Sequence, residues 1–236
     1  MAPVSEVTAV VVAAGRGQRL ADAGAGRPKA LVEVDGRPLL DLTLTTLRAV
    51  RAITAVVVVH PPGAGSDFRA VAGSDVALVA GGTSRSASVR RGVEALVPGS
   101  ELVAIHDAAR PLVPPAVIAD AVEAVTGDVV AAAPGLPVTD TLKRVGAGGD
   151  VLATVGRGGL WAVHTPQVIR RDVLETTLDW ARGRDATDDL SLVEEAIAAG
   201  AVGGRVRLVR GDPRDLKVTH PEDLLVAVAI VRGTRP

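Results

Sequence analysis

The sequence contains no cysteine and no tyrosine, and it has one phenylalanine and two tryptophans among 236 residues. Without cysteine, the chain has no disulfide, no thiolate zinc site and no thiol nucleophile. Aromatic residues make up 1% of the composition. That scarcity disfavours an aromatic cage, a base-stacking platform for single strands and an aromatic-anchored interface. The hydrophobic core must therefore be built from Val, Leu, Ile and Ala.

The sequence also lacks an excess of either charge. It has 26 Lys+Arg and 27 Asp+Glu, a formal net charge of −1, whereas nucleic-acid-binding domains are usually strongly basic. The first apolar run, residues 7–14, has no basic segment before it, and it is far shorter than the roughly 20 residues of a membrane span. We therefore expect a cytoplasmic protein with neither a nucleic acid nor a membrane as its partner.

Several common active-site motifs are missing. The four histidines show no metal-ligand spacing and no HExxH segment occurs, so we expect no metal site built by the protein itself. The sequence has no Walker GxxxxGKS/T segment and no GxSxG elbow. Serine hydrolases and P-loop enzymes are therefore disfavoured.

The sequence does contain an alternation of apolar runs and helical patterns. Leu and Val recur at helical spacing in residues 38–50, 86–96 and 115–125. Continuous Val-, Ala- and Ile-rich runs predict strands buried on both faces, at residues 7–13, 53–60, 76–80, 102–106, 129–133 and 206–209. This order predicts a mostly parallel α/β sheet in one domain, residues 1–236. Ligands of such sheets bind at the carboxyl ends of the strands, so the loops after the runs are candidate sites.

Residues 134–160 interrupt the alternation. Two short β-like runs surround a turn-rich segment at residues 146–150, which predicts a protruding β-hairpin. A hairpin cannot bury a core alone, so we expect this arm to pack on another surface, most simply in a homodimer. From the pattern alone, an ordinary surface hairpin is the simpler interpretation.

The loop after the first run is glycine-rich and basic. Residues 15–29 hold Arg16, Arg19, Arg27 and Lys29 against one acid, Asp22. Backbone amides in such a loop can wrap phosphate oxygens, so the loop favours a nucleoside triphosphate. A dinucleotide fingerprint fits less well, because Leu20 stands at its third glycine position. A glycine-rich turn with solvated charges is the structural alternative.

Residues 81–92, GGTSRSASVRRG, follow the third run. Their backbone amides could read the edge of a base, with Ser88 adding a side-chain hydrogen bond. A Ser-rich cap on the following helix explains the same residues. Asp188 and Asp189 are likewise predicted simply to cap the helix after them.

Two charged loops follow later runs. In HDAARP, residues 106–111, an Asp at a strand end can place a carboxylate near a metal-bound phosphate. The alternative is an Asx turn in which Asp107 pairs with Arg110. In DLKVTHPED, residues 215–223, Lys217 precedes a helix that begins near Pro221, with Thr219 as its predicted cap. Lys217 would then face the strand ends, although by itself it is typical of a surface lysine.

Taken together, these loops resemble one family. AAGRGQR with RPKA, HDAARP, PVTDTLKR, TVGRGGLW with TPQ, and LKVTHPEDL occur in the order seen in 2-C-methyl-D-erythritol 4-phosphate cytidylyltransferases, over about residues 7–230. The resemblance implies a Rossmann-like nucleotidyltransferase sheet with a β-arm that swaps across a homodimer. It also implies transfer of CMP from CTP to methylerythritol phosphate in isoprenoid synthesis, with Mg²⁺ held mainly through the triphosphate.

The resemblance also implies roles for individual residues. Arg19 and Lys29 would stabilise the transition state on the triphosphate side, and Arg157 and Lys217 would act with them as the catalytic set. CTP would be bound by Ala13, Ala14, Gly15, Gly17, Gly82, Ser88, Asp107 and Ala108. Methylerythritol phosphate would be bound by Arg110, Thr141, Arg157, Thr165 and Lys217, with Thr141, Arg157 and Thr165 reaching the neighbouring subunit's site.

The sequence departs from the family pattern at three positions. Thr83 stands where an acid is often found beside the ribose, Ala30 where Gln often follows the lysine, and Gly156 where an acid often precedes the arm arginine. These departures leave open a ribitol-5-phosphate cytidylyltransferase or another sugar-phosphate nucleotidyltransferase. A CTP-binding regulator and a dinucleotide-dependent oxidoreductase are the alternatives from other classes.

The expected chemistry agrees with what the sequence lacks. The nucleophile is a phosphate monoester of the substrate, with a second pKa of about 6, so it is already ionised near neutral pH. It needs neither a thiol nor a histidine-centred base. Catalysis then depends on fixed cations aimed at the charge that develops on the α-phosphate.

Overall fold

The computed structural model describes residues 6–15, 20, 27–184 and 186–233. Within them, one sheet has the strand order β10-β7-β11-β6-β1-β4-β5, with β12 also paired to β7. β1, β4, β5 and β6 are parallel, as are β7 and β12, whereas β11 and β10 are antiparallel to their neighbours. The strands are β1 (Val7–Val12), β4 (Ile53–His60), β5 (Ala77–Ala80), β6 (Leu102–Asp107), β7 (Val129–Pro137), β10 (Trp161–Val163), β11 (Gln167–Arg170) and β12 (Arg205–Arg210). The sheet is therefore mostly parallel, as predicted.

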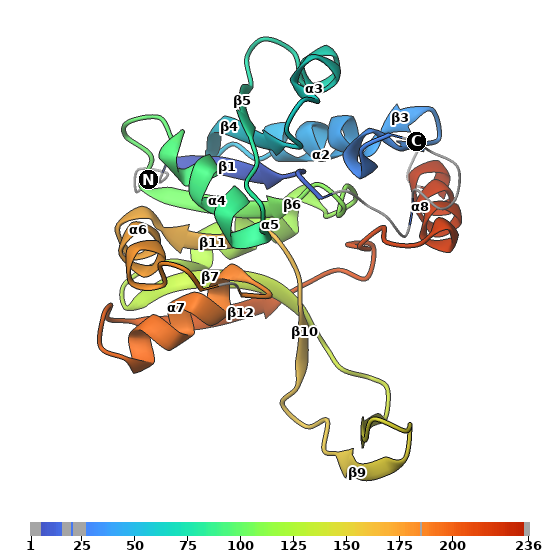
Figure 1. Ribbon diagram of the computed structural model, residues 1–236, viewed down its shortest axis with the longest axis vertical. Helices are drawn as coiled ribbons and strands as arrows, with labels where there is room; N and C mark the ends of the chain where they lie inside the picture. The colour runs from blue at the N-terminus through green and yellow to red at the C-terminus, as the bar shows by residue number, and fades with distance from the viewer. Residues whose placement is uncertain (1–5, 16–19, 21–26, 185, 234–236) are drawn as a thin grey trace.

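Helices lie on both faces of the sheet (Figure 1). They are α2 (Leu39–Arg48), α3 (Gly65–Ala72), α4 (Arg85–Glu94), α5 (Pro115–Ala124), α6 (Arg171–Trp180), α7 (Asp189–Ala198) and α8 (Pro221–Gly233), with a short 3-10 helix, η2 (Lys29–Leu31). Successive strand side chains point to opposite faces. Ala9 and Val11 therefore pack with α2, α3 and α5, whereas Val10 packs with α4, α6 and α7. Burial on both faces explains why the strand sequences are continuously apolar.

A smaller apolar cluster attaches the C-terminal helix. α8 packs beside the hairpin of β2 (Glu33–Val34) and β3 (Arg37–Pro38) and the start of α2. The cap predicted for α8 is wrong in detail. The Asp223 carboxylate accepts the backbone N–H groups of Thr219 and His220 at 2.7 and 2.8 Å, while the Thr219 hydroxyl donates to the Lys217 carbonyl. The carboxylate satisfies two donors at once and holds the end of the Lys217 loop.

The predicted elements are present with shifts at their ends. β5 begins at Ala77, β6 continues to Asp107 and β7 continues to Pro137. The three helices predicted from apolar spacing are α2, α4 and α5, each slightly shorter than its pattern. α7 and α8 begin where the predicted caps place them, at Asp189 and Pro221. The sequence did not predict α3, α6, the three-residue β10 or the four-residue β11, which enters the sheet between β6 and β7.

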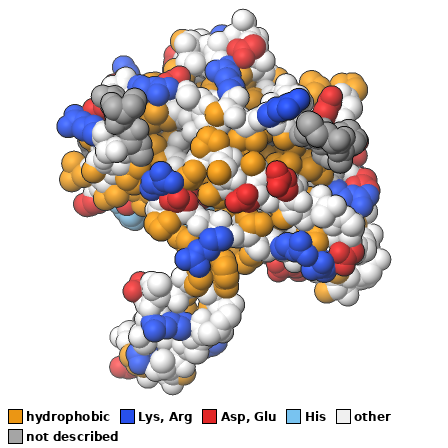
Figure 2. Space-filling model, turned by 180° about the vertical axis from the view of Figure 1, so that it is seen from behind, with side chains coloured by type: hydrophobic (Ala, Val, Ile, Leu, Met, Phe, Trp, Pro, Cys, Tyr) orange, Lys and Arg blue, Asp and Glu red, His pale blue; other side chains and the backbone are white. Residues whose placement is uncertain are grey.

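The arm, predicted at residues 134–160, projects from the body after β7 ends at Pro137 and before β10 begins at Trp161 (Figure 1). Here β8 (Leu142–Val145) and β9 (Val151–Val155) pair antiparallel in a small sheet separate from the central one. Seen from behind, the arm is a distinct lobe that carries basic side chains (Figure 2). It also exposes Val145, Val151 and Leu152, which are 55%, 61% and 65% accessible.

Candidate active site

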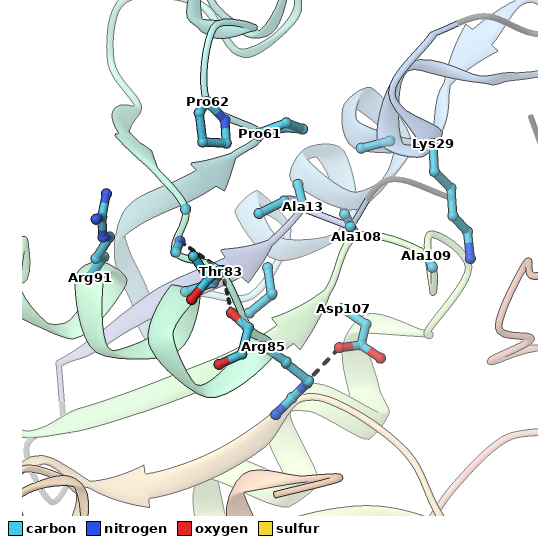
Figure 3. A pocket seen from close by; sticks show the side chains of 18 of the residues that line it. Ala13, Lys29, Pro61, Pro62, Thr83, Arg85, Arg91, Asp107, Ala108 and Ala109 are labelled. Atoms are coloured by element: carbon cyan, nitrogen blue, oxygen red, sulfur yellow. Dashed lines mark hydrogen bonds and ion pairs between the residues drawn. The ribbon is translucent and has the colours of Figure 1, made fainter. Parts of the chain in front are cut away.

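A cavity of about 770 Å³ opens at the carboxyl ends of the parallel strands. The loops after β1, β4, β5 and β6 all contribute to it, together with η2 (Figure 3). The loop before α8 contributes Lys217. Its lining includes Ala13, Ala14, Gly15, Lys29, Gly82, Ser88, Asp107, Ala108 and Lys217. Every described residue predicted to bind CTP therefore lines one cavity, with two of the predicted cations. Gly17 and Arg19 lie outside the described residues.

Tight backbone packing shapes one wall of the cavity. A Cβ atom on Gly81 would lie 2.4 Å from the Ala14 Cβ, so the loops after β1 and β5 can approach only with glycine there. The buried Ser88 hydroxyl accepts the Gly82 N–H at 3.1 Å and donates to the Ser84 carbonyl at 2.8 Å. Ser84 also caps α4, as the Ser-rich segment indicates. Ser88 thus both lines the cavity and holds the turn at residues 82–84 that precedes α4.

Asp107 is the focus of charge in the cavity. Its carboxylate lies 2.7 Å from the Lys217 Nζ and 3.7 Å from the Arg85 Nη2, and the side chain is 13% exposed. Burial alone would raise the pKa of Asp107, but the two cations outweigh it and hold that pKa below its usual range. The Asp107–Arg110 ion pair that the sequence left open is not formed, because Arg110 is directed to Asp215.

Arg85 connects Asp107 to a buried acid on another helix. Its Nη2 lies 2.8 Å from the carboxylate of Asp189, which is 3% exposed at the start of α7. Burial lowers the pKa of Arg85, but the adjacent Asp189 and Asp107 raise it overall. Burial also raises the pKa of Asp189, and the ion pair with Arg85 opposes that rise. Figure 3 shows Arg85 and Asp107 facing each other from α4 and β6.

A hydrogen-bond network lies beneath Asp107. The buried Thr165 hydroxyl accepts the Asp107 N–H at 3.1 Å and lies 3.0 Å from the His106 Nδ1. The His106 Nε2 is 3.1 Å from the Arg110 carbonyl, which can only accept, so Nε2 carries the proton and Nδ1 accepts from Thr165. Burial lowers the pKa of His106, which favours this neutral form. Thr165 therefore holds the end of β6 within its own chain.

The predicted acceptor residues fall into three groups. Lys217 lines the cavity, and its loop is held by Arg110, whose guanidinium donates to the Asp215 carbonyl at 2.9 Å. Thr165 and Arg110 lie behind the cavity wall and are not among its lining residues. Thr141 and Arg157 lie exposed on the arm, where the Arg157 guanidinium donates to the Thr139 carbonyl. Lys217 thus lies beside the residues predicted to bind CTP, whereas Thr141 and Arg157 do not line that cavity.

The three residues that depart from the family pattern lie in two places, the cavity and the arm. Thr83 and Ala30 line the cavity, whereas Gly156 is exposed on the arm with nothing near its Cβ position. Thr83 and Ala30 therefore lie where CTP is predicted to bind, whereas Gly156 does not line that cavity.

The structure adds residues to the site that sequence reasoning did not assign there. Arg85 and Arg91 from α4, and Pro61 and Pro62 after β4, also line the cavity. Asp189 was predicted only as a cap, yet the cap is Asp188, which accepts the Ser191 N–H at 2.8 Å. Two adjacent acids at a helix start are a usable signal, because only one of them can cap.

The described residues contain no group of three or more His, Cys, Asp or Glu side chains that could hold a metal ion. Among the described lining residues, Asp107 is the single acid. One carboxylate together with substrate phosphates is a common way to bind Mg²⁺.

Among the described helices, none has the length and hydropathy to span a bilayer.

Comparisons with known proteins agree with this geometry. A sequence model described as IspD: 2-C-methyl-D-erythritol 4-phosphate cytidylyltransferase matches residues 7–233. The chain is 40% identical over 230 residues to the 2-C-methyl-D-erythritol 4-phosphate cytidylyltransferase of Frankia casuarinae, over 98% of this chain and 83% of that protein. The chain belongs to the 2-C-methyl-D-erythritol 4-phosphate cytidylyltransferase family.

Other family members are similar over the same length. The protein of that name from Saccharopolyspora erythraea is 42% identical over 232 residues, covering 95% of this chain and 99% of the relative. The crystal structure of the protein of that name from Thermus thermophilus is 37% identical with a TM-score of 0.79, covering 96% and 99% of the two chains. Family membership confirms the predicted fold class and the predicted class of enzyme, a nucleotidyltransferase of non-mevalonate isoprenoid synthesis. It favours methylerythritol phosphate over ribitol phosphate as the acceptor.

Proposed function

We propose that the chain transfers CMP from CTP to 2-C-methyl-D-erythritol 4-phosphate, giving 4-diphosphocytidyl-2-C-methyl-D-erythritol and pyrophosphate. The observation that carries this proposal is a single cavity that gathers Lys29, Lys217, Asp107 and Ser88 at the strand ends of a family member. These residues are far apart in the sequence. Their convergence supports one site that receives both a triphosphate and a second phosphate.

The hydrogen bonds of Ser88 support recognition of cytosine over uracil. Its one proton is committed to the Ser84 carbonyl, and one lone pair accepts the Gly82 N–H. The remaining capacity of the hydroxyl is to accept a hydrogen bond. The 4-amino group of cytosine donates, whereas the corresponding uracil oxygen can only accept. A uracil base would need the proton that Ser88 gives to Ser84.

The reaction needs an in-line approach of one anion to another. An oxygen of the acceptor phosphate bonds to the α-phosphorus of CTP, and the bond from that phosphorus to the bridging oxygen breaks as pyrophosphate leaves. We assign Lys29, with Arg19, to the charge that develops on the triphosphate. Lys217 is assigned to the acceptor phosphate, which it can reach from the rim beside Asp107.

Mg²⁺ fits this donor set because Asp107 can supply one carboxylate oxygen while the triphosphate supplies the rest. When bound, the ion would neutralise phosphate charge. The residues of the chain keep the task of placing the two substrates in line. Lys217 and Arg85 already hold the Asp107 carboxylate at the cavity edge.

We also propose a homodimer in which the arm completes the partner's site. Thr141 and Arg157 lie on an exposed hairpin, away from the cavity of their own chain. The exposed Val145, Val151 and Leu152 give the arm an apolar surface that a second subunit would bury. We also propose that the reaction takes place in the cytoplasm.

A pyrophosphate-release assay tests the proposed function. CTP, UTP, ATP and GTP are each combined with methylerythritol phosphate and with ribitol 5-phosphate, with and without Mg²⁺. We expect turnover with CTP and methylerythritol phosphate in the presence of Mg²⁺. Faster release with ribitol 5-phosphate, or with another nucleotide, would refute the assignment.

A further inference from the structure

Two cationic side chains contact Asp107 at different distances, Lys217 from the loop before α8 and Arg85 from α4. The Lys217 Nζ hydrogen-bonds Oδ2 at 2.7 Å from the loop before α8. The Arg85 Nη2 lies 3.7 Å from Oδ1, close enough for an ion pair but too far for a hydrogen bond. The Lys217 side chain is 48% exposed and that of Arg85 is 26% exposed. Lys217 is therefore the closer and more accessible partner, and Arg85 the more enclosed one.

Arg85 is held at this distance by Asp189. The Asp189 and Leu190 N–H groups donate to the Gln167 Oε1 at 2.8 and 3.1 Å, which anchors the start of α7 to β11. The Asp189 carboxylate is therefore fixed as well as buried, and it hydrogen-bonds the Arg85 Nη2 at 2.8 Å. A buried carboxylate strongly needs a paired cation, so Asp189 keeps Arg85 from leaving the cavity wall.

Arg85 also retains unused hydrogen-bonding capacity. Its Nη1 is buried and has no hydrogen-bond partner among the described residues. A small shift of the guanidinium would bring a donor within hydrogen-bond distance of the Asp107 Oδ1. The arrangement can therefore tighten on Asp107 if Lys217 leaves it.

We propose that Arg85, anchored by Asp189, is a positioning residue that shares Asp107 with Lys217 and so frees Lys217 to bind the acceptor phosphate. This inference rests on the proposed function, because it needs Lys217 to serve a phosphate monoester. Without Arg85, Lys217 would be the only cationic side chain of the described residues paired with Asp107. The acceptor phosphate would then have to compete with a stronger ion pair for the same ammonium group.

The test measures acceptor binding rather than turnover. Calorimetry is used to titrate methylerythritol phosphate into protein saturated with a CTP analogue carrying a non-hydrolysable α,β-bridge. The main variant is Arg85→Gln with Asp189→Asn, which removes both charges and leaves no unpaired buried acid. The matched control is Arg90→Gln with Asp179→Asn, an α4–α6 pair at 3.4 Å that does not line the cavity.

For the main variant we expect the acceptor Kd to rise about tenfold while the Kd of the CTP analogue changes less than about threefold. The control pair should leave both constants unchanged. In an Asp107→Asn background, the acceptor Kd should no longer respond to the Arg85 change, because Lys217 has lost its competing partner. Arg85→Lys keeps one charge beside Asp189 but cannot bridge two carboxylates. It should weaken acceptor binding too, and it serves if the double variant does not fold.

Three results would overturn the inference: an unchanged acceptor Kd, an equal loss of donor and acceptor affinity, or an effect that persists with Asp107→Asn. Each of these applies when the unmodified protein binds methylerythritol phosphate. Failure of the unmodified protein to bind that acceptor would instead refute the proposed function.

Discussion

The cavity and the arm use the same kinds of side chain in opposite ways. In the cavity, Asp107 is held by two cations, and its backbone N–H is held by Thr165. On the arm, Thr141 and Arg157 are exposed, and the hairpin pairs mainly with itself. The difference fits the proposed arrangement, in which one chain forms the CTP cavity alone and the arm acts at the cavity of a second chain.

The largest expected effect comes from removing Lys29, one of the two described lysines that line the cavity. Lys29→Ala should lower kcat about 100-fold or more, because we assign its ammonium to the charge that develops on the triphosphate. The matched control on the arm is Lys143→Ala, which removes an exposed lysine bonded to Thr154. Steady-state kinetics with both substrates varied would check this. A raised KM with kcat preserved would show that Lys29 binds the ground state and the transition state equally, which contradicts the assigned role.

The arm arginine should affect the acceptor selectively. Arg157→Ala should raise the acceptor KM about tenfold, the scale of a lost charged hydrogen bond, and leave the CTP KM nearly unchanged. Arg144→Ala, on β8 of the same arm, is the control and should change neither constant. An equal rise in both KM values would contradict the separation between the two regions.

Glycines in the two regions should differ in their tolerance of a methyl group. Gly81→Ala places a Cβ 2.4 Å from the Ala14 Cβ and should lower the free energy of unfolding by about 1–3 kcal/mol. Gly156→Ala meets nothing within 4 Å and should change it by less than about 1 kcal/mol. Urea denaturation measures both. Equal effects would mean that the loops around the cavity are not closely packed.

The smallest expected effect is a pH dependence from His106 beneath the cavity. Burial lowers its folded-state pKa, whereas the unfolded chain takes up a proton below about pH 6.5. The unfolded state then binds more protons, so stability is full above that pH and falls as pH drops toward the folded pKa. The slope should be at most about 1.4 kcal/mol per pH unit from this group.

Unfolding measured at pH 7.5 and 5.5, with His106→Gln as the reference, isolates the contribution of His106. The arm contains no histidine, so this dependence belongs to the cavity side. Protonation of the His106 imidazole above pH 6.5, seen by NMR, would contradict the expected direction.

The sequence predicted most of the sheet, because strands buried on both faces leave continuous apolar runs that need no knowledge of their neighbours. It missed β11, whose four residues are a strand only through pairing with β6 and β7. The residues that line the cavity could be predicted from the loops after the strands, because the carboxyl ends of parallel strands converge at one edge of the sheet. The role of Asp189 beside Arg85 could not be predicted. It depends on a contact across 104 positions, and Asp189 stands next to another acid that caps the same helix.

The central claim is that the cavity of one chain and the arm of another make one site. It is tested by joining Lys29→Ala and Arg157→Ala chains in dimers isolated through two different affinity tags. Such a dimer has one site with both residues intact and one with neither. At acceptor concentrations well below the KM of the Arg157→Ala enzyme, we expect about half of the unmodified activity, far above either parent homodimer. Activity no higher than that of the parents would show that the arm acts on its own chain or not at all.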